Sequence, residues 1–182
     1  MTETPSAMIS IGTPMPAFSL PDSSGITWSI SENKVGYLIV FMCNHCPFVV
    51  HVADTLKRIA NRCGEVGIEM VGINSNDAVA YPADAPDKMV EAAIAYGWTF
   101  PYLVDESQDV ARAFQAACTP DVFLYDGQRN LYYRGQLDDS RPSSSVPSDG
   151  QDLLGAIDRL LAENSPPEDQ KPSIGCNIKW KG

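Results

Sequence analysis

The feature that most constrains this chain is a pair of cysteines placed between an apolar run and a helical pattern. The run Tyr37–Met42 has the length of a strand, and its continuous apolar character is typical of a strand buried on both faces of a sheet. Cys-Asn-His-Cys-Pro follows at once, over residues 43–47. Apolar residues then recur at helical spacing from Phe48 to Cys63, and we expect Gly64 to end that helix.

The next segment places this unit in a parallel sheet. Ile68–Asn74 reads as a second buried strand, and strand, helix, strand predicts a βαβ unit with parallel strands. Elsewhere we expect an N-terminal hairpin (18–20 with 26–30), helices over 87–96, 107–117 and 151–163, a strand over 102–104, and a second hairpin (122–125 with 131–134). Residues 1–16 read as an extended arm, 75–86 and 140–149 as loops, and 164–182 as a tail.

Length and charge narrow the class of protein. The chain has 182 residues, which favours one domain, with a core over about residues 16–163 and a C-terminal tail over 164–182. A net charge of −10 disfavours nucleic acid and anionic membrane surfaces as partners. The sequence shows neither a signal-peptide pattern nor an apolar run long enough to span a bilayer, so we expect a cytoplasmic protein without a membrane partner.

A Cys-x-x-Cys at a strand-to-helix turn has a specific chemical use. Cys43 lies near the helix N-terminus, where free N–H groups favour a thiolate, the nucleophilic form of cysteine. Cys46 lies about one turn further on and can resolve a mixed disulfide. Pro47 suits the first helical position, and a protonated His45 would favour the Cys43 thiolate. The alternative for His45 is a solvent-facing side chain in a tight turn.

Zinc binding and inert thiols are the alternatives for this pair. The spacing of cysteines 43, 46, 118 and 176 lacks the paired Cys-x-x-Cys signature of a zinc site, and the chain has no Gly-rich phosphate loop. We therefore expect no metal and no cofactor. Cys63 falls on the apolar helix face and reads as a packing residue. The following acidic residues read as caps, turns and surface charge: Asp77, Asp84, Asp87, Asp105 and Glu106.

Several motifs together resemble a known family. The cysteine turn after a buried strand, with Thr119-Pro120 before a later strand, resembles the thioredoxin superfamily. The N-terminal extension and Phe-Pro-Tyr-Leu-Val-Asp-Glu over 100–106 resemble its peroxiredoxin-like (AhpC/TSA) branch. Cys-Asn-His-Cys-Pro-Phe-Val, Ile-Asn-Ser-Asn-Asp, Ala-Cys-Thr-Pro-Asp and Gly-Cys-Asn-Ile-Lys-Trp-Lys are similar to a subgroup of bacterial thioredoxin-like proteins.

The resemblance implies an α/β thioredoxin fold, a three-layer α/β/α arrangement with a central mixed sheet, here with an N-terminal β-hairpin extension. It implies a cis peptide bond at Pro120 that faces the cysteines, and a place beside Thr119 for an extended substrate. Asn44, His45 and Pro47 would support the site. Cys118 and Cys176 are candidate accessory thiols, for which an internal disulfide, Cys118 with Cys176, is one alternative to packing.

These observations predict a redox enzyme. The first hypothesis is a thiol–disulfide oxidoreductase that uses the Cys43/Cys46 dithiol on protein or small-molecule disulfides, with an unidentified reductant as its second partner. The second is an antioxidant thiol peroxidase, although Cys43 stands where peroxiredoxins carry Thr or Ser. The third is a redox-regulated or zinc-binding interaction module without turnover.

Overall fold

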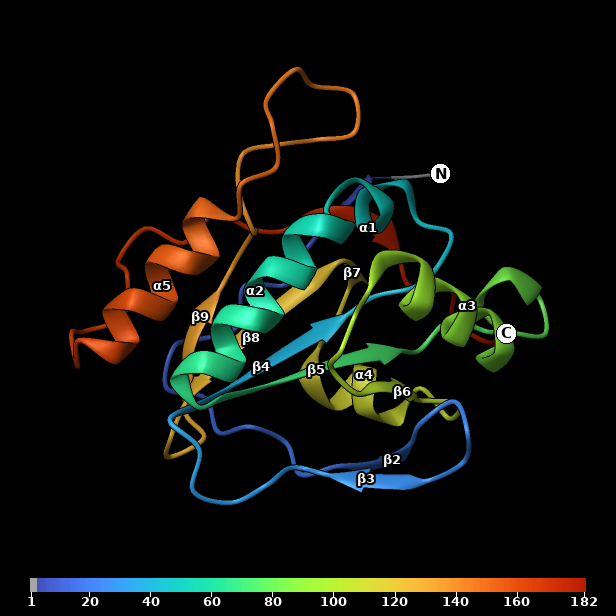
Figure 1. Cartoon of the computed structure of the whole chain (residues 1–182), viewed down its shortest axis with the longest axis horizontal. Helices are drawn as coiled ribbons and strands as arrows, with labels where there is room; N and C mark the ends of the chain where they lie inside the picture. The colour runs from blue at the N-terminus through green and yellow to red at the C-terminus, as the bar shows by residue number, and fades with distance from the viewer. Residues whose placement is uncertain (1–2) are drawn as a thin grey trace.

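A computed structural model gives the fold of the chain and describes residues 3–182. Its central sheet has the strand order β6-β5-β4-β8-β9 (Figure 1). The strands are β4 (Gly36–Phe41), β5 (Ile68–Asn74), β6 (Tyr102–Val104), β8 (Asp121–Asp126) and β9 (Leu131–Arg134). β4, β5 and β6 are paired in parallel, whereas β8 pairs antiparallel with β4 and with β9. The predicted mixed sheet and parallel βαβ unit are therefore confirmed.

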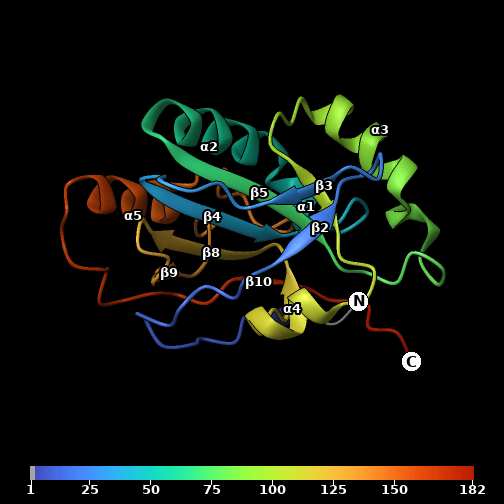
Figure 2. The same cartoon turned by 90° about the horizontal axis from the view of Figure 1, so that it is seen from below.

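Alternate residues of β4 face opposite layers, as expected for a strand in the middle of a sheet. Leu38 and Val40 belong to the core beneath α2 (Ala53–Val66) and α5 (Gln151–Leu161). Ile39 and Phe41 belong to the core on the other side, with α4 (Asp109–Phe114). Figure 2 shows α2 and α4 on opposite sides of the sheet. Each such buried side chain contributes about 1.5–3 kcal/mol of transfer free energy, so the two cores hold three layers together.

The helix after the cysteines differs from the prediction. It is divided into α1 (Pro47–His51) and α2, because Val52 between them has φ −101° and ψ 10°. The helix also continues past Gly64 and ends at Gly67, whose φ of 78° gives it a left-handed C-cap. Gly64 does not end the helix, because an isolated glycine inside a helix only lowers its stability. The helix end requires a residue in the left-handed conformation, and Gly67 provides it.

The two ends of the chain form strands that the sequence did not predict. β1 (Glu3–Pro5) and β7 (Cys118–Thr119) both pair antiparallel with β10 (Ile174–Asn177). Cys176 and Ile178 are buried, so this part of the tail belongs to the core. Strands of two to four residues carry too little periodicity to be detected, and here pairing across the chain creates them.

The remaining elements largely match the prediction. β2 (Ser19–Pro21) pairs with β3 (Thr27–Ser29) as the N-terminal hairpin, and α3 (Pro86–Tyr96) ends at Gly97. A short 3-10 helix, η1 (Pro82–Asp84), interrupts the expected loop over 75–86. α4 is shorter than the predicted helix over 107–117, because residues with positive φ, Gln108 and Gln115, bound it. Within residues 3–182, none of the helices has the length and apolar character needed to cross a membrane.

Candidate active site

The two cysteines lie at the end of β4, where the chain turns into α1. Cys46 is the N-cap residue of α1 and Pro47 occupies the first helical turn. Both cysteines are buried, and both belong to the core under α2. The short β4–α1 connection therefore holds the two thiols in fixed positions beside the end of a central strand.

The Thr119–Pro120 loop faces both thiols. The Thr119–Pro120 peptide bond is cis, which confirms the prediction for Pro120. The Cys43 sulfur lies 3.4 Å from Thr119 Oγ1, and the Cys46 thiol donates a hydrogen bond of 3.1 Å to the Thr119 carbonyl oxygen. The loop thus offers one hydroxyl to Cys43 and one carbonyl to Cys46, although 73 or more residues separate it from the cysteines.

The two thiols share a hydrogen bond, which drives their acidities apart. The Cys43 thiol as donor, with further hydrogen bonds from Thr119, Cys176 and the Val49 backbone, lowers the pKa of Cys46 to about 5 in spite of burial. The same hydrogen bond, burial and the Asp84 charge raise the pKa of Cys43 well above its ordinary value. The shared hydrogen bond therefore shifts the two pKa values in opposite directions, downward for Cys46 and upward for Cys43.

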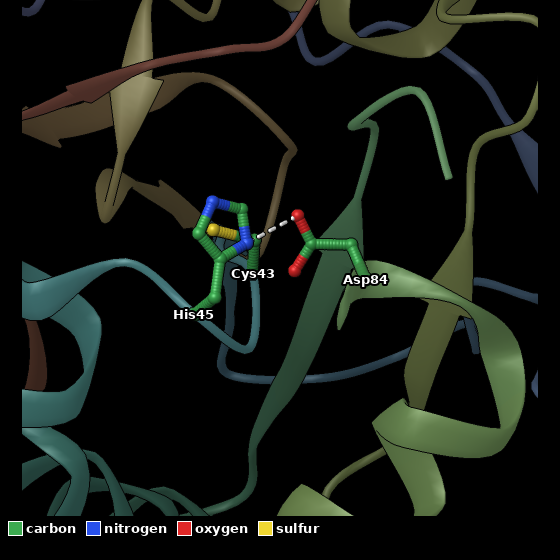
Figure 3. A group of neighbouring side chains, drawn as sticks. All are labelled: Cys43, His45 and Asp84. Atoms are coloured by element: carbon green, nitrogen blue, oxygen red, sulfur yellow. Dashed lines mark ion pairs between the residues drawn. The ribbon is translucent and has the colours of Figure 1, made fainter. Parts of the chain in front are cut away.

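Asp84 is the functional candidate that sequence reasoning missed. It was interpreted as one of several capping, turn or surface acids, which is wrong, because its side chain is fully buried beside the cysteine turn. Its Oδ1 accepts a hydrogen bond from the Asn44 backbone N–H (2.9 Å), and its Oδ2 accepts one from Asn76 Nδ2 (2.8 Å). His45 Nδ1 lies 2.8 Å from Oδ2 (Figure 3).

A positional signal for Asp84 did exist. The loops after neighbouring parallel strands meet at the carboxyl edge of a sheet, where active sites of α/β folds are found. The cysteine turn follows β4, and Asp84 lies in the long segment that follows β5. An acid in that segment was thus a candidate, but nothing in the residue pattern distinguished it from Asp77 or Asp87.

Asn44 fixes the turn between the cysteines. Its side-chain Nδ2 donates to the Ala83 carbonyl (3.1 Å), and its Oδ1 accepts from the Tyr102 hydroxyl (2.9 Å). Together with the bond from its backbone N–H to Asp84, these contacts connect the turn to η1 and β6. His45 stacks on Tyr81, with ring centroids 6.0 Å apart and planes 2° from parallel. Asn44 and His45 therefore have defined positions.

The two candidate accessory thiols occupy different places. Cys176 pairs across from Thr119 in β10, and its thiol is hydrogen-bonded to the Cys46 sulfur. Burial and this contact raise the pKa of Cys176 to about 12. Cys118 instead directs its thiol towards the Pro120 carbonyl (3.6 Å), and burial raises its pKa. All five cysteines are free thiols, and Cys63 lies in the core as a packing residue, as predicted.

A small cleft opens beside Pro120. Its lining includes Phe48 of α1, Ile174 of β10 and the loop residue Arg141. His51 also lines it, and its Nε2 lies 2.9 Å from Ser140 Oγ. The cleft therefore combines apolar and polar side chains next to the loop that faces the thiols.

Fold and site together define the class of protein. A mixed sheet with the order β6-β5-β4-β8-β9, a Cys-x-x-Cys turn after β4 and a cis-proline loop opposite are the features of a thioredoxin-fold protein. Residues 11–134 match the sequence model described as the AhpC/TSA family. The chain therefore belongs to the AhpC/TSA family.

Solved structures share this fold. An uncharacterized conserved protein from Geobacillus kaustophilus is 46% identical, with a TM-score of 0.96 over 100% of this chain and 97% of that one. A hypothetical protein from Sinorhizobium meliloti 1021 is 43% identical, with a TM-score of 0.96 over 98% and 99%. The thioredoxin domain of a thiol-disulfide oxidoreductase from Bacteroides vulgatus shares the fold at 16% identity, with a TM-score of 0.64 over 84% and 99%.

Among curated proteins, none matches the chain. The family and its thioredoxin-fold neighbours indicate a redox enzyme at the level of class. The narrower subgroup defined by the Cys-Asn-His-Cys motif stays a prediction, because the two structures most similar in sequence described above carry no assigned activity.

Proposed function

We propose that the protein is a thiol–disulfide oxidoreductase whose Cys43/Cys46 dithiol exchanges with disulfides of proteins or small molecules. The observation that carries the proposal is the hydrogen-bonded sulfur pair opposite the cis-proline loop. The shared hydrogen bond lowers the pKa of Cys46 and raises that of Cys43, which favours a pair that shares one proton. A dithiol in this state is prepared for exchange, since the thiolate is the reactive form.

Cys43 is the proposed attacking sulfur. Its neighbour His45 is partly exposed, whereas the groups around Cys46 (the Thr119 carbonyl, Cys176 and Val49) are all buried. The proton of Cys43 passes to the Cys46 thiolate through their shared hydrogen bond. Cys46 then donates to the Thr119 carbonyl, and the Thr119 hydroxyl stabilises the new Cys43 thiolate. Cys46 is thus the base that activates Cys43.

Disulfide exchange then follows in two balanced steps. The Cys43 thiolate attacks one sulfur of the substrate disulfide, and the other sulfur leaves as a thiolate. Cys46 gives up its proton to that leaving thiolate and attacks Cys43, which releases the second substrate sulfur as a thiolate. The dithiol loses two electrons, the substrate disulfide gains them, and an external dithiol or thiol returns the protein to its reduced state.

The substrate chain is proposed to lie in the cleft beside Pro120. The cleft adjoins the loop that contacts both sulfurs, and its apolar residues Phe48 and Ile174 can contact an extended substrate that lies across it. Arg141, also in the lining, offers a cation in a chain whose net charge is −10. This arrangement favours a disulfide flanked by apolar or acidic groups.

Trapping tests the mechanism directly. Cys46→Ser should form a mixed disulfide on Cys43 more slowly than wild type reacts, because the Cys46 base is lost, but the adduct should accumulate, because resolution is blocked. Peptide mass spectrometry locates the adduct, and Cys63→Ala serves as the control, since Cys63 is remote from the pair. Failure of Cys46→Ser to form a Cys43 adduct with glutathione disulfide, cystine or an unfolded disulfide-containing protein would contradict the proposal.

One observation favours a second candidate, thiol peroxidase activity at Cys46. Cys46 is the cysteine with the lowered pKa, and it is the N-cap residue of α1. The chain also resembles peroxiredoxins, which have a peroxide-reactive cysteine. Peroxide decay with the reduced protein, followed by stopped flow, distinguishes the two activities. A Cys46-dependent rate well above that of free cysteine would support the peroxidase, and a rate no faster than free cysteine would eliminate it.

A further inference from the structure

Three different metal-binding donors meet at the end of β4. Cys43 Sγ, His45 Nδ1 and a carboxylate oxygen of Asp84 all lie within 4.8 Å of one another (Figure 3). Two of them come from the cysteine turn and the third comes from η1. We propose that the reduced protein binds one Zn²⁺ ion through these three side chains.

The His45 ring and the Asp84 carboxylate already lie at hydrogen-bonding distance. The Nδ1 atom of His45 is buried and lies 2.8 Å from Asp84 Oδ2, so a proton on Nδ1 can join the two atoms. A metal ion would take the place of that proton and accept the lone pair of a neutral imidazole.

The ligands are held by further contacts, as in known metal sites. Asn76 Nδ2 and the Asn44 backbone N–H donate to the Asp84 carboxylate, at 2.8 and 2.9 Å, and fix its orientation. Stacking on Tyr81 fixes the plane of the His45 ring. These contacts preorganise two of the three ligands, so that binding requires little rearrangement.

The donor set selects the metal. Thiolate, imidazole and carboxylate together suit Zn²⁺, whereas Mg²⁺ and Ca²⁺ prefer oxygen ligands alone. Zinc–ligand distances of about 2.0–2.3 Å place tetrahedral donors roughly 3.3–3.6 Å apart. Donors that lie within 4.8 Å of one another therefore need only small shifts, in which His45 Nδ1 and Asp84 Oδ2 move slightly apart from their present 2.8 Å. The charges also balance, since one thiolate and one carboxylate neutralise a divalent cation in a buried place. Three protein ligands leave a fourth position for water.

Zinc binding and disulfide exchange would compete for Cys43. If the proposed oxidoreductase chemistry holds, a substrate disulfide that oxidises Cys43 and Cys46 removes the sulfur ligand and releases Zn²⁺. The disulfide gains two electrons and leaves as one thiolate and one thiol, which takes the Cys46 proton. Zinc would then protect the reduced dithiol until an oxidising disulfide arrives. The binding itself does not depend on this chemistry.

Cobalt and zinc titrations test the site. Reduced protein titrated with Co²⁺ should give a thiolate-to-cobalt charge-transfer band that saturates at one equivalent and disappears on addition of Zn²⁺. Cys43→Ser should abolish the band. Asp84→Asn and His45→Gln should each weaken zinc at least about tenfold in competition with a chromophoric chelator, because even the loss of an outer contact costs 10–100-fold. Asp87→Asn, an exposed acid in α3, is the control.

A second measurement uses the unaltered chain, in case a variant fails to fold. Zn²⁺ should protect Cys43 from iodoacetamide at neutral pH, as located by peptide mass spectrometry, and a chelator should restore labelling. A charge-transfer band that survives Asp84→Asn and His45→Gln unchanged would show that zinc uses the cysteines alone, and would overturn the proposal. So would the absence of both the band and the protection, which leaves the disulfide chemistry standing.

Discussion

The buried ion pair behind the cis-proline loop offers a sharp test of what holds the site in place. Asp121 begins β8 and Arg134 ends β9, and both side chains are fully buried. The carboxylate contacts both terminal nitrogens of the guanidinium and also accepts a hydrogen bond of 2.9 Å from the Ala117 backbone N–H. Asp121 thus connects the sheet to the segment that precedes Thr119 and Pro120.

The expected perturbation is Asp121→Asn, which keeps the shape and removes the charge. Breaking a buried ion pair by removing one partner costs about 3–5 kcal/mol, because the other charge stays buried without compensation. Arg134 retains contacts with the Ala7 and Val122 carbonyls (3.1 and 3.2 Å) and with the Phe123 ring (3.7 Å). These neutral partners reduce the penalty, so we expect about 3 kcal/mol, the lower end of the range.

Urea unfolding of the reduced protein measures the effect. A domain of this kind has a free energy of unfolding of about 5–15 kcal/mol, so a loss of about 3 kcal/mol should clearly lower the midpoint. Glu91→Gln, which breaks the exposed Lys88–Glu91 pair, is the matched control and should cost under about 1 kcal/mol. The double variant Asp121→Asn/Arg134→Met should be more stable than Asp121→Asn alone, since no charge stays unpaired.

Two results would refute this reasoning. A loss below about 1 kcal/mol for Asp121→Asn would mean that the guanidinium finds compensation elsewhere. A double variant no more stable than the single one would mean that the cost comes from the Ala117 hydrogen bond or from packing and not from the buried charge.

Three further predictions concern the site. Thiolate absorbance of the reduced protein should rise as the pH increases through about 5, and Cys46→Ala should abolish this step. Because the folded pKa of Cys46 lies below the ordinary value of 9.0, the free energy of unfolding of wild type relative to Cys46→Ala should rise with pH between about 5 and 9; a constant difference would contradict the assignment. Gly175→Ala should slow disulfide exchange, since a Cβ there would collide with the Thr119 carbonyl. The control Gly155→Ala, with open space in α5, should leave the rate unchanged. Equal rates for the two variants would contradict the role of the Thr119–Pro120 loop. A glutathione redox titration should give a potential less negative than about −270 mV, the thioredoxin value, because a thiolate stabilised on Cys46 favours the reduced form; a more negative potential would contradict it.

The parts of the fold that the sequence predicted are those with strong local patterns. β4 is a continuous apolar run, β5 is mostly apolar, and α3 ends at a glycine, so their existence followed from residue pattern and stop signals. β1 and β10 could not be predicted in this way. β10 has only four residues, and its place between β1 and β7 follows from contacts across the whole chain.

The same distinction applies to the site. The cysteine turn and the Thr119-Pro120 loop are each made of residues that are close together in the sequence and form a recognisable motif. The structure brings the two motifs together. Asp84 lies 40 residues from Asn44, in a segment without periodicity, and only the loops at the edge of the sheet bring it to the turn. The lowered pKa of Cys46 could not be predicted from the sequence, since its contacts with Thr119 and Cys176 depend on the tertiary fold.

The arrangement around Cys43 explains how one small site can serve two proposed chemistries. On one side, the Cys46 thiolate can take the Cys43 proton and prepare it for disulfide exchange. On the other, the carboxylate of Asp84 and the adjacent Nδ1 atom of His45 can hold a cation against the same sulfur. Both chemistries use the Cys43 thiolate. Bound zinc therefore prevents disulfide exchange, and a disulfide on Cys43 prevents zinc binding. The thiol–disulfide balance around the protein would therefore decide which one the site carries out, and zinc would be bound only when the dithiol is reduced.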